Sequence, residues 1–187
     1  MSKRGQALLV LFLAAAFCCR AAASVLPVPK QVDTLAARHP AFYGSFVLGS
    51  DFPEDVTRAV FGEIASLART GALPELSVTL SSARGIWGYE LVWRGCDVSI
   101  KAVDAGNAVF ALQTLKQLLR AGCVEDLSIV DWADVPKRVF MDDISRGAVP
   151  NMEQMKRQIR LLSELKYNAC MFYNENVIST SSHPDIA

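Results

Sequence analysis

The sequence has little histidine and no excess of basic charge. Only 2 of its 187 residues are His, and 19 basic side chains balance 19 acidic ones. A nucleic-acid partner is therefore not expected, because such proteins usually carry a basic patch or stripe. His39 and His183 have no Cys, His or carboxylate nearby at ligand spacing, so we expect both to be solvated. No metal and no cofactor is predicted.

Glycine-rich phosphate loops are also missing. Gly106-Asn107 stands at the start of a predicted helix and could in principle hold an anion. Without further glycines in a phosphate-loop pattern, we interpret this pair as a simple helix start.

The longest apolar run lies near the N-terminus and is too short to cross a membrane. Residues 7–18 are apolar, follow Lys3 and Arg4, and precede small residues ending at Ala23. A span needs roughly 20 apolar residues. The pattern is typical of a secretory signal peptide over residues 1–23, and bulky Phe17 before Cys18 argues against a lipoprotein anchor. We therefore predict an exported protein, periplasmic or extracellular, without a membrane span.

Cysteine is sparse beyond that segment. Cys96, Cys123 and Cys170 fit no zinc motif, and an odd number leaves at least one thiol outside a disulfide. We expect three structural thiols. A Cys96–Cys123 disulfide remains the alternative.

Residues 24–135 show the pattern of an α+β domain. The pair of alternating runs around Arg94-Gly95 predicts a β-hairpin, and the helix near residues 106–120 carries an apolar stripe. Asp51 is the candidate cap of an earlier helix that Gly71 ends. The predicted fold is an antiparallel sheet with helices on one face. Its predicted strands cover residues 25–29, 46–50, 76–81, 88–93, 97–102 and 127–131.

Residues 136–187 have a different pattern, which begins after the predicted linker at residues 136–138. A strand over residues 139–144, a helix capped by Asn151 and Gln154, and a strand over residues 167–173 predict a βαβ unit with parallel strands. We expect Met152, Met155, Ile159, Leu162 and Leu165 to line one face of its helix.

Charged and polar side chains crowd the end of the first strand of this unit. Asp142, Asp143, Ser145 and Arg146 follow an apolar run that begins at Val139. Burying charges there has a desolvation cost that packing alone does not explain. In (β/α) barrels, substrate-contacting residues lie at such strand ends.

Two motifs give the chain a family resemblance. The helix near residues 106–119 is similar to "G-x-x-x-A-x-x-T-L-x-Q-L", and residues 143–146 are similar to "D-x-S-R". In this order they resemble the family 20 glycoside hydrolases, the β-N-acetylhexosaminidases, over residues 25 to 178. The resemblance implies that the α+β domain is followed by the first β-α-β of a (β/α)8 TIM barrel. Residues 138–187 are too few for a barrel of roughly 250 residues, so we expect an N-terminal fragment that is inactive alone.

The resemblance also assigns binding roles. Arg146 would hydrogen-bond hydroxyls of a terminal N-acetylhexosamine, and Asp143 would orient Arg146 or contact the sugar. A buried Asp143–Arg146 pair that only closes the strand end is the alternative. Glu175 would contact substrate, or cap or pair structurally. The chain departs from the family at Gly147, where His is usual, at Arg138-Val139, where Arg-Gly is usual, and at residues 172–176, where a His-Trp-His run is common.

No catalytic residue is assigned. In the family, the substrate's acetamido oxygen attacks the anomeric carbon while a Glu, preceded by Asp, protonates the leaving oxygen. No Asp-Glu dipeptide occurs in this sequence, and Asp142-Asp143 cannot replace it because Asp143 belongs to the binding motif.

Two other functions stay open. One is a non-catalytic carbohydrate-binding or interaction module, and the other is a barrel glycosidase such as an α-glucuronidase, which the D-x-S-R match disfavours. The expected partner is a glycan with terminal N-acetylhexosamine. The sequence does not indicate which oligomeric state the protein adopts.

Overall fold

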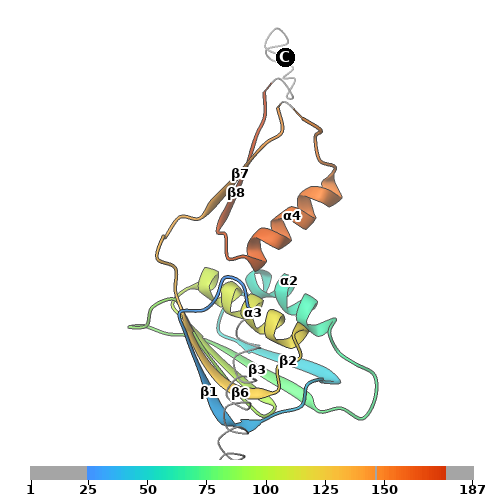
Figure 1. Ribbon diagram of the computed structural model, residues 1–187, viewed down its shortest axis with the longest axis vertical. Helices are drawn as coiled ribbons and strands as arrows, with labels where there is room; N and C mark the ends of the chain where they lie inside the picture. The colour runs from blue at the N-terminus through green and yellow to red at the C-terminus, as the bar shows by residue number, and fades with distance from the viewer. Residues whose placement is uncertain (1–24, 146, 176–187) are drawn as a thin grey trace, which may run out of the picture. The chain divides into compact units, whose positions relative to one another are not determined.

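The computed structural model describes residues 25–145 and 147–175, and the chain divides into two compact units, Met1–Ala133 and Asp134–Ala187 (Figure 1). The predicted signal peptide, Arg146 and His183 lie outside the described residues. Among the residues that are described, no helix is both long and apolar enough to cross a membrane.

The first unit contains a six-stranded sheet in the order β1-β6-β4-β5-β3-β2. Helices α2 and α3 lie on one of its faces, as predicted (Figure 1). The bounds of these elements are β1 Gln31–Arg38, β2 Ser45–Ser50, α2 Glu54–Ala65, β3 Glu75–Ser82, β4 Tyr89–Arg94, β5 Asp97–Ala102, α3 Ala105–Arg120 and β6 Glu125–Asp131.

The sheet is mixed, so the prediction of an antiparallel sheet is wrong. Strands β2 and β3 pair in parallel, and β3 and β5 also pair in parallel. The first pair is parallel because α2 carries the chain back across the sheet between the two strands, which is the connection that parallel neighbours need. The second pair forms because β4 pairs with one edge of β5 and β3 pairs with the other edge.

Alternation along the strands places the core between the sheet and the helices. In β5, Val98, Ile100 and Ala102 are buried while the residues between them are exposed. The predicted stripe of α3 packs on this face. Its members Ala108, Leu112, Leu115 and Leu119 are all buried. Fully burying one leucine side chain contributes roughly 1.5–3 kcal/mol, so the sheet and α3 stabilise each other.

Two polar contacts tie α3 into this core. The Tyr89 hydroxyl lies 2.6 Å from Thr114 Oγ1 and donates to Asp131 Oδ2 at 3.1 Å. Burial and the nearby Asp131 carboxylate raise the pKa of Tyr89 well above 10.0, which keeps the phenol protonated as a donor. The second contact is the ion pair between Lys116 Nζ and Glu63 Oε2, at 2.7 Å, which joins α3 to α2.

The β4–β5 hairpin forms as predicted. Arg94 pairs with Asp97, and Gly95 adopts a φ of 58° in the turn between them. A positive φ is easily reached by Gly because it has no Cβ. At the other end of β4, a Cβ on Gly88 would lie 2.1 Å from the Asp131 carbonyl oxygen, so β4 can start this close to β6 only with glycine.

The first predicted strand is misplaced. The chain enters the sheet at Gln31, and residues 25–29 form no strand. Val25 is fully buried, and both polar groups of the Leu26 backbone are bonded to the Gln117 side chain, at 2.7 and 2.9 Å. This apolar segment is therefore held by a helix side chain and by packing, and alternation alone could not distinguish it from a strand.

His39 is buried, which contradicts the prediction that it is solvated. Its side chain is 6% exposed and stacks on Trp93 with ring centroids 4.1 Å apart. Its Nε2 lies 3.1 Å from the Glu125 carbonyl oxygen, and its Nδ1 lies 3.2 Å from the Tyr43 hydroxyl. All of these partners except Tyr43 are distant in the sequence, so the local pattern gave no sign of them. The contacts give His39 a structural role.

Helix α2 begins and ends differently from the prediction. Pro53 occupies the N-cap position without a side-chain cap, and Asp51 instead donates its backbone N–H to Leu80 O at 2.9 Å. Asp51 thus continues the edge of β2 beside β3. The helix ends at Ala65, before Gly71. At α3 the cap is Asp104, whose Oδ1 accepts from Asn107 N at 2.7 Å, so a protein carboxylate already occupies this helix start.

Cys96, Cys123 and Cys170 are thiols, and the alternative Cys96–Cys123 disulfide is not formed. Cys123 is buried and its Sγ lies 3.6 Å from the Glu125 carbonyl oxygen.

The second unit is the predicted βαβ element. Strand β7 (Val139–Asp143) and strand β8 (Ala169–Tyr173) pair in parallel, and α4 (Met152–Glu164) connects them. The capping box is confirmed, because Asn151 and Gln154 exchange hydrogen bonds of 2.9 Å. The predicted stripe of α4 is largely uncovered in the described residues: Leu162 is buried, whereas Met152 is 66% exposed and Ile159 49%.

Candidate substrate-binding edge

Polar side chains gather where β7 and β8 end. Parallel strands end at the same side of a sheet, and the register places Asp143 directly beside Tyr173. The Ile144 N–H extends this pairing by donating to Tyr173 O at 2.9 Å. We call Asp143, Ser145, Tyr173 and Glu175 the β7/β8 edge.

Asp143 is exposed and is held in place by the residue two positions after it. Its Oδ1 accepts from the Ser145 backbone N–H at 2.9 Å and from the Ser145 hydroxyl. Hydrogen bonds donated to a carboxylate favour its charged form. The Ser145 side chain, and then its backbone N–H, lower the pKa of Asp143 below its ordinary value of 3.8. The carboxylate is therefore ionised at neutral pH and has a fixed orientation.

The second carboxylate is held from β8. The Tyr173 hydroxyl donates to Glu175 Oε1 at 2.7 Å. This bond to Glu175 raises the pKa of the Tyr173 hydroxyl above 10.0, with smaller contributions from burial and from the Asp143 charge. Tyr173 consequently stays protonated and orients Glu175.

Asp142 does not belong to this edge. Successive residues of a strand point to opposite faces, so the Asp142 side chain leaves the sheet on the side opposite Asp143. There Asp142 Oδ2 accepts from Gln158 Nε2 of α4 at 3.0 Å. This hydrogen bond joins α4 to β7, which gives the Asp142 carboxylate a structural role.

The structure thus brings two of the predicted site residues, Asp143 and Glu175, to the ends of neighbouring strands. Arg146 lies outside the described residues. The sequence placed Ser145 among the polar side chains at this strand end without giving it a role, and it did not point to Tyr173. The signal for both was spacing: each lies two residues from a predicted carboxylate, within reach of a local hydrogen bond.

Chemically, the β7/β8 edge offers carboxylate acceptors and hydroxyl groups to solvent. Carboxylates accept hydrogen bonds, and hydroxyls both donate and accept. This set suits a neutral ligand with many hydroxyl groups. In residues 25–145 and 147–175, no group of three or more His, Cys, Asp or Glu side chains is arranged to hold a metal ion.

In this chain a domain with a mixed sheet and two helices precedes a parallel βαβ unit with carboxylates at its strand ends. Solved structures that share this fold include β-N-acetylhexosaminidases, and the resemblance to the family 20 glycoside hydrolases is confirmed.

One of these is the Streptomyces plicatus N-acetyl-β-hexosaminidase, solved in complex with thio-NAglucal. It shares 25% identity with this chain at a TM-score of 0.67, over 81% of this chain and 34% of that one. Variants of the same enzyme were solved with the product GlcNAc.

Two further structures show the same fold. The Streptomyces coelicolor β-N-acetylhexosaminidase is 24% identical at a TM-score of 0.70, over 86% of this chain and 37% of its own. The Vibrio harveyi exo-β-N-acetylglucosaminidase is 19% identical at a TM-score of 0.68, over 89% and 28% respectively. This chain therefore spans about a third of the length of the enzymes that it matches. No protein-family model and no curated protein sequence matches it.

Proposed function

We propose that this chain is part of an exported glycosidase that removes terminal β-linked N-acetylhexosamine from glycans by substrate-assisted, retaining hydrolysis. The observation that supports this most strongly is the likeness to the Streptomyces plicatus hexosaminidase, at 25% identity over 81% of the chain. Export rests on the signal-peptide pattern of residues 1–23.

In this proposal the β7/β8 edge binds the terminal sugar. Arg146 donates hydrogen bonds to vicinal hydroxyls, because its planar guanidinium presents several donors in a fixed fork. Asp143 and Glu175 accept hydrogen bonds from other hydroxyls. Ser145 and Tyr173 are positioning residues, since each holds one of the carboxylates in a single orientation.

The bond-breaking residues of the proposed reaction are not in this sequence. The acetamido oxygen of the substrate would attack the anomeric carbon while a glutamic acid protonates the departing glycosidic oxygen. The resemblance places that glutamate after an aspartate, and no Asp-Glu dipeptide occurs between Met1 and Ala187. The residues present here would bind and orient the sugar without performing the chemistry.

Titration with N-acetylglucosamine tests the binding role. We expect amide signals of residues 143–147 and 173–175 to shift in ¹⁵N-correlated NMR spectra of the chain. Arg146→Ala and Asp143→Asn should each weaken binding roughly tenfold, the loss expected when a charged hydrogen bond to a ligand is removed. Arg157→Ala removes an exposed arginine of α4 and is the matched control. Equal weakening in the control, or no shift at the β7/β8 edge, would contradict the proposed site.

A second test is to read the coding DNA past Ala187. The proposal expects an open frame of about 300 codons, enough for the rest of a barrel, that includes an Asp-Glu pair. A stop codon directly after Ala187 would rule out the hydrolase.

A non-catalytic carbohydrate-binding or interaction module is the second candidate. It is supported by the β7/β8 edge itself, whose oriented carboxylates suit sugar binding without any bond-breaking residue. A stop codon together with a stable short product that binds N-acetylglucosamine through Arg146 would support this candidate over the first.

A further inference from the structure

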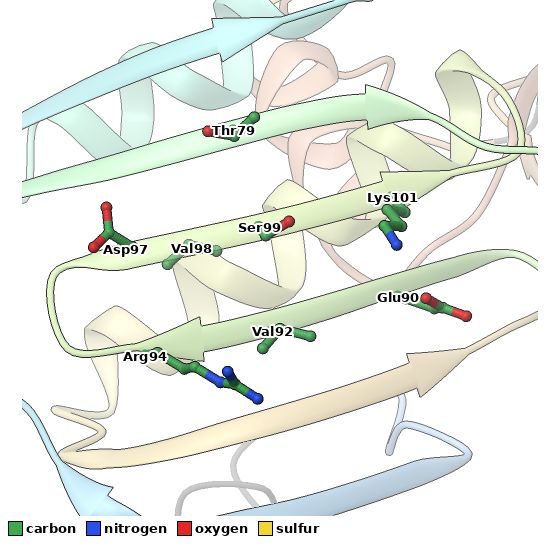
Figure 2. Close-up of a pocket in the computed structure, with 8 residues that line it drawn as sticks. All are labelled: Thr79, Glu90, Val92, Arg94, Asp97, Val98, Ser99 and Lys101. Carbon is green, nitrogen blue, oxygen red and sulfur yellow. The ribbon is translucent and has the colours of Figure 1, made fainter.

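The sheet of the first unit carries a groove on the face opposite α2 and α3. The groove has a volume of about 450 Å³ and lies over β3, β4 and β5 (Figure 2). Pockets for small ligands typically span roughly 300–1,000 Å³. This groove shares no residue with the β7/β8 edge.

Side-chain size explains why the groove forms. Thr79, Ser99 and Val92 are consecutive partners across β3, β5 and β4, so they form one row on the open face. All three side chains are short, and the floor is therefore low. Longer side chains lie on both sides of this row, two residues further along β4 and β5 in each direction. The sheet face is hollowed between them.

These longer side chains belong to four charged residues. Arg94 pairs with Asp97 in the register at one end, and Glu90 pairs with Lys101 at the other. Figure 2 shows the two pairs on either side of Val92 and Ser99. Because all four residues belong to hydrogen-bonded strands, the sheet fixes the distances between their backbone positions. The groove is therefore better defined than a set of charges on a loop.

Their side chains are not used by the fold. Among the described residues, none of the four forms a hydrogen bond or an ion pair through its side chain. Arg58, by contrast, is engaged by Glu54 at 3.0 Å on α2. Cross-strand partners of opposite charge usually bond to each other. Here they do not, and their donors and acceptors are available to a ligand in the groove.

The chemistry of the groove defines its ligand. Two cations and two anions cancel, which disfavours phosphates, nucleic acids and other ligands with a net charge. Arg94 and Lys101 donate hydrogen bonds, Glu90 and Asp97 accept them, and the Thr79 and Ser99 hydroxyls do both. A neutral chain with alternating donors and acceptors along its length, as in an oligosaccharide, is complementary to this arrangement.

We propose that this groove is a second, non-catalytic binding site for a neutral oligosaccharide. The inference rests on the proposed function, which supplies N-acetylglucosamine glycans as the class of ligand. A glycan would bind here through internal sugars, which the β7/β8 edge, as a site for a terminal sugar, does not bind. The groove is open and its lining contains no aromatic ring, so binding should be weak, with a Kd of about 1 mM.

The test is a ¹⁵N-correlated NMR titration of the full chain with chitotetraose, up to about 10 mM, which is well above the expected Kd. We expect the amides of Thr79, Ser99 and Lys101 to shift. Arg94→Ala should weaken this binding about fivefold. Ser99→Ile should abolish it by filling the floor with a bulkier aliphatic side chain that exposed strands accept. Arg84→Ala, an exposed arginine outside the groove, is the control and should bind unchanged.

The same spectra separate this inference from the proposed function. Shifts confined to the β7/β8 edge would overturn the groove and support the terminal-sugar site. Shifts confined to the groove would support the groove and overturn the terminal-sugar site. If the groove amides shift only when the protein concentration is raised, a second copy of the chain occupies the groove, and the inference is overturned. The absence of groove shifts in the presence of chitotetraose would also overturn it.

Discussion

At the scale of single residues, the hydrogen bonds of Asp143 determine the pH range in which its side chain is a carboxylate. The Ser145 hydroxyl and N–H lower its pKa below 3.8. Because the shift is downward, the charged form is retained at neutral and mildly acidic pH. It is lost only as the pH falls through the lowered value.

This gives a test of the positioning role of Ser145. In Ser145→Ala the hydroxyl bond is lost while the backbone bond remains, so the pKa of Asp143 should rise towards 3.8. Ser145→Thr keeps the hydroxyl and should restore the low value. The measurement is the carboxyl ¹³C shift of Asp143 across an acid titration. An unchanged midpoint in Ser145→Ala would show that the hydroxyl does not hold this carboxylate.

A second residue-scale prediction concerns the ion pair between α3 and α2. The Lys116 side chain is 1% exposed, whereas that of Glu63 is 31% exposed. Glu63→Ala takes the carboxylate away from a buried ammonium and should destabilise the fold by about 3 kcal/mol. Lys116→Met leaves a carboxylate that water can reach and should cost about 1 kcal/mol. Urea unfolding measures both, and equal losses would contradict the asymmetry.

At the scale of elements, α3 and α4 have similar amphipathic patterns and different surroundings. Residues 111–119 of α3 are all buried, and in α4 only Leu162 is. A helix with little packed surface depends more on local interactions. The Asn151–Gln154 capping box should therefore contribute a larger share of the stability of α4 than a cap does in α3.

Removing the cap tests this dependence. Asn151→Ala should destabilise α4 by about 1 kcal/mol, which accelerates amide hydrogen exchange in its first turns about fivefold. Asn151→Asp keeps a side-chain acceptor and should exchange at the original rate. Amides of α3 serve as an internal control and should not change. Equal exchange in Asn151→Ala and the unaltered chain would show that the cap does not stabilise α4.

At the scale of the whole molecule, an exposed segment of the chain connects the two units. Residues 134–137 are exposed and form no helix or strand. The sequence predicts a domain boundary at residues 135–136, and this stays a prediction that proteolysis can address. Exposed connections between compact units are preferred cleavage sites.

Limited digestion with trypsin should therefore cut first after Lys137. The expected product is a resistant fragment that contains β1 to β6 and ends at Lys137, identified by its mass. In Lys137→Gln the remaining cut in this segment is after Arg138, whose half-buried side chain donates to Lys166 O and Val135 O, so a fragment of β1 to β6 that is one residue longer should form more slowly. Early cleavage within β3 to β5, or no stable product, would contradict two separate units.

Much of the local structure could be predicted from the sequence, because it depends on residues close to one another in the chain. The Arg94-Gly95 turn, the stripe of α3 and the Asn151–Gln154 box each follow from short-range spacing. The parallel pairing of β7 and β8 follows from a helix between two strands. The positions of Asp143 and Glu175 at the ends of those strands follow from it as well, and the motifs led to the family resemblance.

Only the tertiary structure decided which distant residues meet. It placed β3 between β2 and β5 and made the sheet mixed, buried His39 against Trp93, and aligned Thr79, Ser99 and Val92 into the floor of a groove. Local patterns fix the backbone conformation and the side chains that alternate to one face. Strand order and partners depend on contacts between segments far apart in the chain, and no short-range pattern in a single sequence encodes them.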